Sequence, residues 1–312
     1  MLAIIIVSWN VRELLRRCIE TVSESLAGGG IAAQIVVVDN ASADGSAAMV
    51  RATFPGVALL ESGGNLGFAG GNNLGLRWLL RQDSPPDAIM LLNPDTEVVG
   101  DALPRLVAFL AATPDAIAVG PRLRYGDGSQ QSSRRRFPTP ALFLAESTPL
   151  ERLWPDNPWA RRYRMAGSDD DATQDVGWLV GAALLVRRSA IERGGLLDAG
   201  FALYSEEVEW QLRLRRAGGR IVYLPDAVIT HFEGRSSGQV ELRRLILFHT
   251  SRLRYASLVW GEHTASIVRC GLLAIYGAEW AVEVGKWLLG HRRALRAERV
   301  AAYGALLRAL RS

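Results

Sequence analysis

Four short polar sequences could together form a ligand-binding site in this chain of 312 residues. Each follows directly after an apolar run, and asparagine or aspartate occurs in all four. A single asparagine or aspartate is common in turns and helix caps, but its recurrence after four successive runs favours a binding crevice. The four sequences are Ser8-Trp9-Asn10, Asp39-Asn40, Gly63-Gly64-Asn65 and Asn93-Pro94-Asp95.

A glycine-rich sequence at residues 65–73 follows the third apolar run and opens a helical pattern. Its backbone N–H groups could approach an anion closely. Two common nucleotide sites are nevertheless excluded. The first apolar run is followed by Ser-Trp-Asn-Val-Arg, where a Rossmann dinucleotide site needs a glycine-rich turn, and the Gly-Lys-Ser/Thr sequence of a P-loop is absent.

The apolar runs that precede these polar residues alternate with amphipathic helical patterns. Uncharged strands that alternate with helices predict an α/β domain with a mainly parallel sheet covered on both faces. In such a sheet, ligands bind at the carboxyl ends of the strands. The patterns predict strands at 2–7, 34–38, 57–60, 88–92 and 117–119, and helices at 11–26, 42–52, 69–80 and 101–112.

The second half of the chain is less regular. Residues 121–173 are rich in Gly, Pro, Arg and Asp, which predicts a functional insertion or a mobile lid. An apolar run at 176–186, a helix near 205–217 and a strand at 220–224 follow, and beyond residue 239 the patterns are helical. We therefore expect a catalytic domain at 1–238, with a nucleotide-binding half at 1–120 and an acceptor-binding, catalytic half at 121–238. A helical C-terminal extension would occupy 239–312.

The cysteines and the N-terminus indicate a cytoplasmic protein. Cys18 and Cys270 lie far apart in the sequence and near no group of histidines, which argues against a disulfide framework or a zinc site. The first residues lack the positive region of a signal peptide. No uncharged apolar run of about 18 residues occurs, so we expect no membrane span.

The C-terminal extension is basic and contains tryptophan. From Arg269 onward it has eight Lys and Arg against three Glu, within a chain of net charge +4. Such a tail fits an anionic membrane surface at the inner face of the plasma membrane, or a phosphorylated acceptor, better than nucleic acid. Packing on the catalytic domain, or on a second subunit in a homo-oligomer, is the alternative. The stripe consists of Tyr276, Trp280 and Trp287 beside Arg292, Arg293, Arg296 and Arg299.

Six motifs, in their order and spacing, resemble the family 2 glycosyltransferases of the GT-A fold, and within them the rhamnosyltransferase-like branch. The resemblance covers residues 1–257 and implies inversion at the anomeric carbon. It also implies a dTDP- or UDP-sugar donor of L-rhamnose or a related hexose, a divalent metal (Mg²⁺ or Mn²⁺), and a saccharide or polyprenyl-linked acceptor in cell-surface polysaccharide synthesis. The motifs are IIIVSWN, VVVDNASADGS, NLGFAGGNN, LLNPDTEV, VGAALLV and YSEEVEWQLRLRRAGGRIVYLPDAVITHFEG.

The resemblance assigns the donor site to the polar residues that follow the strands. Asp39 matches the carboxylate that holds the nucleotide base, and Ser8 and Asn10 match the loop beside it. The donor-binding set is completed by Asn65, Gly70, Gly71, Asn72, Asn93 and Asp95.

The expected metal site has one carboxylate. Asn93-Pro94-Asp95 matches the Asp-x-Asp motif of the family, with asparagine in the first acidic position. Metal binding therefore rests on Asp95 and on His231, which matches a late metal or diphosphate histidine. Mg²⁺ and Mn²⁺ accept mixed carboxylate, phosphate and water ligands, so a single aspartate with donor oxygens is workable.

The catalytic base is expected in the Glu206-Glu207 pair, which matches a Glu-Asp pair in the family. The second member is the base there, so the resemblance implies Glu207, with Glu206 as the alternative. An inverting transfer is a direct displacement in which the acceptor hydroxyl loses its proton as it attacks. Two other functions are alternatives: an inactive sugar-nucleotide-binding scaffold, and a nucleotidyltransferase, which would need a glycine-rich basic loop after the first strand.

Overall fold

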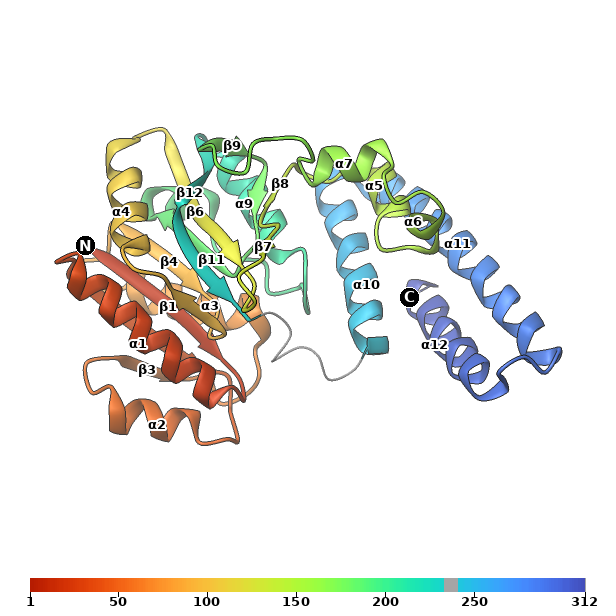
Figure 1. The fold of residues 1–312 in the computed structure, drawn as a ribbon, viewed down its shortest axis with the longest axis horizontal. Helices are drawn as coiled ribbons and strands as arrows, with labels where there is room; N and C mark the ends of the chain where they lie inside the picture. The colour runs from red at the N-terminus through yellow and green to blue at the C-terminus, as the bar shows by residue number, and fades with distance from the viewer. Residues whose placement is uncertain (233–240, 312) are drawn as a thin grey trace. The chain divides into compact units, whose positions relative to one another are not determined.

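The computed structural model describes residues 1–232 and 241–311. Contacts within the chain divide it into two units (Figure 1). The domain boundary predicted at residue 238 lies outside the described residues. Residues 137–166, expected in the catalytic half, belong to the second unit. The first unit comprises Met1–Arg136, Gly167–Gly200 and Glu206–Gly238, and the second comprises Phe137–Ala166, Phe201–Ser205 and Gln239–Ser312.

A ten-stranded sheet forms the centre of the first unit, with eight strands in the order β3-β2-β1-β4-β11-β6-β12-β5. Its strands are parallel from β3 through β4 and again between β6 and β12, while β11 is antiparallel to both its neighbours. This sheet confirms the predicted α/β architecture. The strands are β1 (Leu2–Ser8), β2 (Ala33–Asp39), β3 (Ala58–Glu61), β4 (Ala88–Leu92), β5 (Thr96–Val98), β6 (Ala116–Arg124), β7 (Gln130–Gln131), β9 (Gln174–Val176), β11 (Ala183–Arg187) and β12 (Arg220–His231), with β8 (Arg134–Arg135) and β10 (Trp178–Leu179) forming a second small sheet.

Helices cover both faces of the sheet because consecutive side chains of its central strands, which point to opposite faces, are apolar. On β1, Ile4 and Ile6 join the core with Leu15 of α1 and Leu106 of α4. On the opposite face, Ile5 lies against Gly75 of α3. The helices of this unit are α1 (Arg12–Gly28), α2 (Ser46–Thr53), α3 (Gly67–Leu80), α4 (Ala102–Ala112), α8 (Arg188–Gly194) and α9 (Glu206–Arg216).

Three short helices occupy part of the region that the sequence predicted as an irregular insertion. They are α5 (Pro140–Ala145), α6 (Pro149–Leu153) and α7 (Pro158–Tyr163). Each begins with a proline in the first turn, and the side chain of the preceding residue caps it: Thr139 accepts from the Leu142 N–H, Thr148 from the Leu150 N–H and Asn157 from the Ala160 N–H. A capping residue followed by proline is a helix-start signal, so these helices could have been found in the sequence.

The second unit also contains α10 (Glu241–Trp260), α11 (Glu262–Leu288) and α12 (Arg293–Arg311). Buried Arg252 is paired with Glu146 and lies over the Phe248 ring at 4.0 Å. Tyr276 donates to the Ser147 carbonyl at 3.1 Å and is 2.8 Å from His249 Nε2, which must therefore be the donor of that second bond. Burial, followed by the charge of Arg252, lowers the pKa of His249 to about 3, so its ring is neutral.

Two parts of the predicted C-terminal stripe lie elsewhere than expected. Tyr276 is 2% exposed, and Arg296 is 8% exposed and paired with Glu283. Trp280 and Trp287 are partly exposed. The stripe is therefore divided between the core of the second unit and its surface.

Among the described helices, α11 alone is long and apolar enough to cross a bilayer by length and composition, where the sequence predicted no span. It has 27 residues, and an 18-residue window within it is apolar enough for a span by length and composition. Arg269 and Glu279 interrupt the apolar sequence of this helix, so it contains no long uncharged run. Of that window, 22% is buried against the rest of the protein.

Candidate active site

The first two parallel strands end in a pair of buried polar side chains. Ser8 of β1 and Asp39 of β2 are partners in the sheet register, and their side chains are 0% and 4% exposed. Asp39 Oδ2 accepts from the Ser42 N–H at 3.1 Å. Asp39 Oδ1 and Ser8 Oγ have no hydrogen-bond partner among the residues that the structure describes. Because such groups are costly when unsatisfied, this strand end is suited to a polar ligand.

Asn10 ties the loop after β1 to the loop after β2. Its side-chain oxygen accepts from the Ala43 N–H at 2.7 Å, and its own N–H donates to Ser42 Oγ at 3.0 Å. Its φ of 54° lies in the left-handed region that asparagine tolerates better than most residues. Asn10 therefore fixes the loop after β1 against the loop after β2, and its contact with a donor remains a prediction.

The glycine-rich sequence forms the start of α3, and the glycines allow this helix to approach the sheet closely. A Cβ on Gly71 would lie 2.6 Å from Val7 Cγ1 of β1, whereas one on Gly70 would meet Leu66, the residue before the helix, at 2.8 Å. The amide side chains serve the local fold: Asn65 Oδ1 accepts from the Gly67 N–H at 2.9 Å, and Asn72 Nδ2 donates to the Phe68 carbonyl at 2.9 Å. Direct donor contacts of these four predicted residues remain untested.

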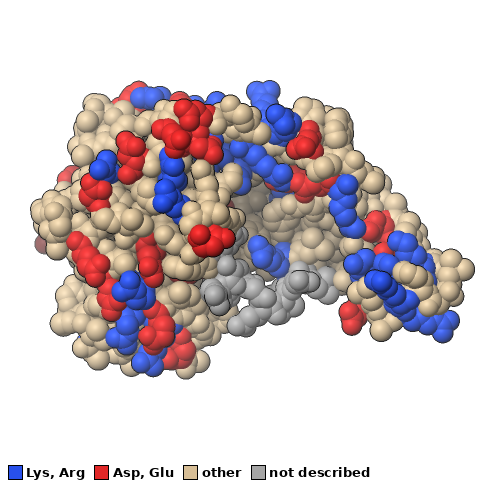
Figure 2. Space-filling model, in the orientation of Figure 1, with Lys and Arg blue, Asp and Glu red and all other residues tan. Residues whose placement is uncertain are grey.

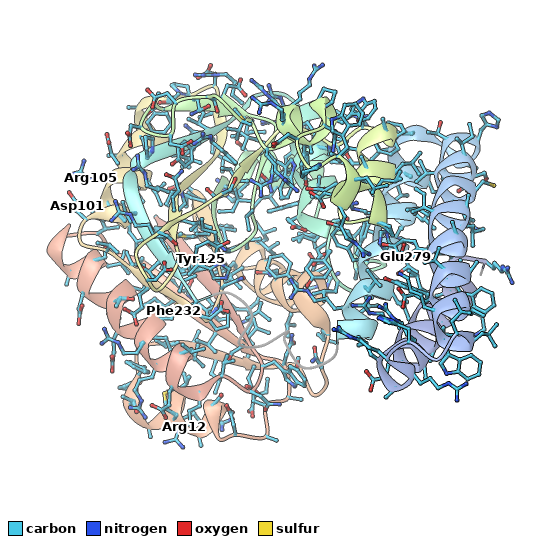
Figure 3. All side chains as sticks on the ribbon, turned by 45° about the vertical axis from the view of Figure 1, so that its right-hand side comes forward. Arg12, Asp101, Arg105, Tyr125, Phe232 and Glu279 are labelled. Carbon is cyan, nitrogen blue, oxygen red and sulfur yellow. The ribbon has the colours of Figure 1, made fainter. Side chains whose placement is uncertain are left out.

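Asp95 and His231 meet at the carboxyl ends of β4 and β12. His231 Nε2 lies 3.4 Å from Asp95 Oδ1 and 3.4 Å from Asn93 Nδ2. The Phe232 N–H donates to the Asp95 carbonyl at 2.8 Å, which fixes the two strand ends together. Figure 3 labels Phe232 at this end of β12. Separated by more than 130 positions in the sequence, Asn93 and His231 thus lie side by side.

Gln131 determines which nitrogen of His231 is available. Its side-chain Oε1 lies 3.0 Å from His231 Nδ1, and both residues are about 5% exposed. An amide oxygen only accepts, so Nδ1 carries the proton and the lone pair of the neutral ring is on Nε2. That lone pair faces Asp95 and Asn93. Sequence reasoning missed Gln131, because the two-residue strand β7 has no local signature.

This arrangement fits a divalent cation. Neighbouring ligands of an octahedral ion with bonds of 2.0–2.1 Å lie about 3 Å apart, and the separation between Asp95 Oδ1 and His231 Nε2 is close to that. The described residues contain no group of three or more His, Cys, Asp or Glu with metal-site geometry. The protein would therefore supply two such ligands and leave the other positions to phosphate and water.

Glu207, in the first turn of α9, has the electrostatics of a general base. Its side chain is half-buried, and its Oε2 has no hydrogen-bond partner among the described residues. Burial is the main cause that raises the pKa of Glu207 to about 6. A base with a pKa near the working pH is the most effective, since it is ionised and can still accept a proton.

Buried Gln211 holds α9 in place one turn beyond Glu207. It accepts from the Leu179 N–H at 2.8 Å and donates to the Leu179 carbonyl at 2.7 Å and to the Glu207 carbonyl at 3.1 Å. These bonds attach α9 to the strand β10. Gln211 was not recognised in the sequence, where its place in a charged helix suggests a solvent-facing side chain.

The turn Gly181-Ala182 connects the predicted base to the predicted metal site. A Cβ on Gly181 would lie 3.4 Å from Glu207 Cβ and 3.2 Å from Phe68 Cζ in the glycine-rich sequence. The next carbonyl, of Ala182, accepts from the Asn93 N–H at 2.8 Å. The structure therefore brings Glu207, the start of α3 and the Asn93-Pro94-Asp95 sequence to one place.

Comparison with known proteins identifies the family. A sequence model described as Glycosyl transferase family 2 matches residues 3–195. The chain belongs to this family. An N-acetylglucosaminyl-diphospho-decaprenol L-rhamnosyltransferase of Mycobacterium tuberculosis is 32% identical over 223 residues, which cover 70% of this chain and 72% of that protein. The low-salt glycan biosynthesis hexosyltransferase Agl10 of Haloferax volcanii is 28% identical over 215 residues, 69% of this chain and 62% of that one.

A solved structure with the same fold contains both a nucleotide sugar and a metal. The mannosyltransferase PcManGT from Pyrobaculum calidifontis, in complex with GDP-Man and Mn²⁺, matches with a TM-score of 0.52 at 18% identity and covers 98% of this chain and 86% of its own. This likeness confirms the predicted GT-A-like fold. With the family match, it identifies the chain as a glycosyltransferase.

Proposed function

We propose that this enzyme transfers L-rhamnose, with inversion, from a dTDP-sugar to a hydroxyl of N-acetylglucosamine on a diphospho-polyprenol. The sugar and the acceptor are those in the name of the mycobacterial relative. The observation that supports the proposal is the pairing of Asp95 and His231 at 3.4 Å beside the Gly181-Ala182 turn, because a diphosphate bound to this pair would lie near Glu207.

Asp95 and His231 would hold Mg²⁺ or Mn²⁺ in this enzyme. When bound, a divalent cation neutralises negative charge that gathers on the leaving diphosphate. Asn93 would contact the donor beside it, and Gln131 would keep His231 Nε2 turned toward the site. Asp39 and Ser8, with their unpartnered oxygens, would receive the nucleotide base and its sugar.

Glu207 would accept the proton of the acceptor hydroxyl as the oxygen attacks the anomeric carbon. The C–O bond to the diphosphate breaks as the new glycosidic bond forms, so the proton goes to the Glu207 carboxylate and the electron pair leaves with the diphosphate. A pKa near 6 leaves Glu207 mostly ionised at neutral pH, ready to act.

We also propose that the enzyme works at the cytoplasmic face of a membrane that contains its lipid-linked acceptor. The basic composition of the chain after Arg269 supports this location.

Mass spectrometry of the products tests the proposed reaction directly. The purified chain is incubated with a short-chain N-acetylglucosaminyl-diphospho-polyprenol and with dTDP-L-rhamnose, UDP-N-acetylglucosamine or GDP-mannose, each with Mg²⁺, Mn²⁺ or excess chelator. We expect a rhamnosylated product from dTDP-L-rhamnose in the presence of metal. Preference for another donor would contradict the proposed sugar, and undiminished transfer in chelator would contradict the metal site.

A further inference from the structure

The turn that joins α11 to α12 exposes three large apolar side chains in succession. Trp287, Leu288 and Leu289 are 41%, 64% and 87% exposed. Residues 286–293, here named the hairpin tip, contain these three and the turn that follows. Scattered exposed apolar residues are ordinary on a protein surface, but a contiguous group marks an interaction site.

The backbone of the hairpin tip is fully formed, so these side chains are presented on an ordered turn. The His291 N–H donates to the Lys286 carbonyl at 3.1 Å, and the Gly290 N–H donates to the Trp287 carbonyl at 3.0 Å. Gly290 has a φ of 80°. This is the Schellman arrangement, which satisfies the last carbonyls of a helix with glycine in the left-handed conformation.

The charges of the hairpin tip are all positive. Lys286, Arg292 and Arg293 are exposed, and the sequence contains no Asp or Glu from residue 284 to residue 297. Figure 2 shows Lys and Arg side chains gathered over the α11–α12 hairpin. Apolar side chains flanked by cations match the two layers of an anionic lipid surface, which offers hydrocarbon beneath negatively charged headgroups.

The carboxylate that precedes the hairpin tip is neutralised inside the hairpin. Glu283 is 1% exposed and accepts two hydrogen bonds from Arg296 at 2.8 and 2.6 Å. Although burial opposes ionisation, the bond from Arg296 and the nearby cations hold the pKa of Glu283 below its ordinary value. Glu283 therefore joins α11 to α12 behind the tip without presenting negative charge to a membrane.

We propose that the hairpin tip inserts Trp287, Leu288 and Leu289 into the interface of an anionic bilayer, with Lys286, Arg292 and Arg293 on the headgroups. This surface deepens the proposed function and rests on it, because it names the contact through which the enzyme reaches a lipid-linked acceptor. Interfacial docking fits α11 better than a span, since Glu279 and Glu283 are held by Arg152 and Arg296 of neighbouring helices.

Sedimentation of the full-length protein with vesicles tests the proposal, using phosphatidylcholine with 30% phosphatidylglycerol or phosphatidylcholine alone. We expect binding to the anionic vesicles that weakens at high salt. The double variant Leu288→Gln/Leu289→Gln should lose at least tenfold in affinity. Since each cation near an anionic surface is worth about fivefold in affinity, Arg292→Gln/Arg293→Gln should lose roughly 25-fold.

Matched controls separate the hairpin tip from general surface effects. Leu153→Gln changes an 82% exposed leucine on α6, and Arg308→Gln/Arg311→Gln removes two exposed cations at the other end of α12. Both controls should retain most vesicle binding. Equal loss in tip and control variants would overturn the proposal.

Three further outcomes would also overturn it. The first is equal binding to neutral and anionic vesicles. The second is resistance of the bound protein to alkaline carbonate extraction, which is typical of a spanning helix. The third is a change of oligomeric state in the tip variants without lipid, which would mean that the tip binds a second copy of the chain. Vesicle binding needs no substrate, so it can succeed even if rhamnose transfer is not found. Conversely, transfer to a water-soluble acceptor should be unchanged in the tip variants.

Discussion

Replacing Glu207 by glutamine should abolish sugar transfer and, at neutral pH, stabilise the protein. The amide keeps the shape of the side chain but cannot accept a proton at neutral pH. General base catalysis contributes a factor of about 10²–10⁴, so the turnover of Glu207→Gln should fall by about that factor while the KM for the donor changes little. Wild-type kcat/KM should rise with pH through about 6 and level off above it, because only ionised Glu207 is active.

The expected stabilisation follows from the same shift in pKa. Burial raises the pKa of Glu207 from 4.5 to about 6, so the folded protein holds this proton more tightly than the unfolded chain. The raised pKa of Glu207 therefore does not change wild-type stability below pH 4.5, the pKa of this group in the unfolded chain. Above it, wild-type stability falls as the pH rises from about 4.5 to above 6. At about 1.4 kcal/mol per pH unit, the cost reaches about 2 kcal/mol at pH 7.5. Glu207→Gln removes this cost, so its advantage over wild type should grow by about 2 kcal/mol between pH 4 and pH 7.5.

Two measurements test this reasoning on the same preparations. Single-turnover transfer at pH 7.5 gives the chemical rate, and thermal unfolding at pH 4 and pH 7.5 gives the stability difference. Glu192→Gln is the matched control, since Glu192 forms an exposed pair with Arg188 at 2.7 Å and should change neither quantity. If Glu206→Gln loses transfer while Glu207→Gln retains it, the base is the neighbouring residue. A stability difference independent of pH would refute the burial argument.

Substitutions at four further positions have defined outcomes. Asp95→Asn should weaken Mn²⁺ binding, measured by electron paramagnetic resonance, at least tenfold; unchanged affinity would remove Asp95 from the metal site. Gln131→Leu should reduce Mn²⁺ affinity by about 10–100-fold. Gln131→Glu keeps an acceptor for His231 Nδ1 and should therefore retain most of the Mn²⁺ affinity. An equal loss of affinity in both variants would indicate damage to the fold. Gly71→Ala should destabilise the protein by about 1–3 kcal/mol in thermal unfolding, because its Cβ would meet Val7. Gly277→Ala, where nothing lies near the added methyl group on α11, should instead stabilise the protein by up to about 1 kcal/mol. If Gly71→Ala and Gly277→Ala both stabilise or both destabilise the protein, the packing argument is contradicted.

Much of the first unit is predictable from the sequence, because strand and helix patterns alternate there without interruption. The run Leu2–Val7 and the helical spacing after Val11 correspond to β1 and α1 within one or two residues. The prediction fails between residues 121 and 173, where α5, α6 and α7 have only five or six residues each. Helices of this length are too short to show the helical repeat of apolar residues, so only their capping residues indicate them in the sequence.

That the polar residues after β1, β2 and β4 lie together was predictable, because the carboxyl ends of parallel strands lie at the same edge of a sheet. The residues that orient them were not. Gln131 and Gln211 act through side chains that bind distant segments of the chain. Gln131 binds His231, which is 100 positions away in the sequence, and Gln211 binds Leu179, which is 32 positions away. Neither has a local pattern, since a glutamine in a loop or a charged helix is ordinarily solvated. Nor did the sequence indicate that Asn72 donates to its own helix backbone.

The Gly181-Ala182 turn lies between the proposed base and the proposed metal site and contacts each through a different residue. A Cβ on Gly181 would already touch Glu207 at 3.4 Å and press on Phe68 at 3.2 Å, so a larger side chain has no room beside Glu207, whose pKa burial raises to about 6. The Ala182 carbonyl is bound to Asn93, whose neighbour Asp95 faces the available nitrogen of His231. A side chain at residue 181 would displace Glu207 or Phe68 and leave the Ala182 bond intact. Gly181→Val should therefore lower kcat more than it lowers Mn²⁺ affinity, and an equal loss of both would show that the turn holds the two groups as one unit.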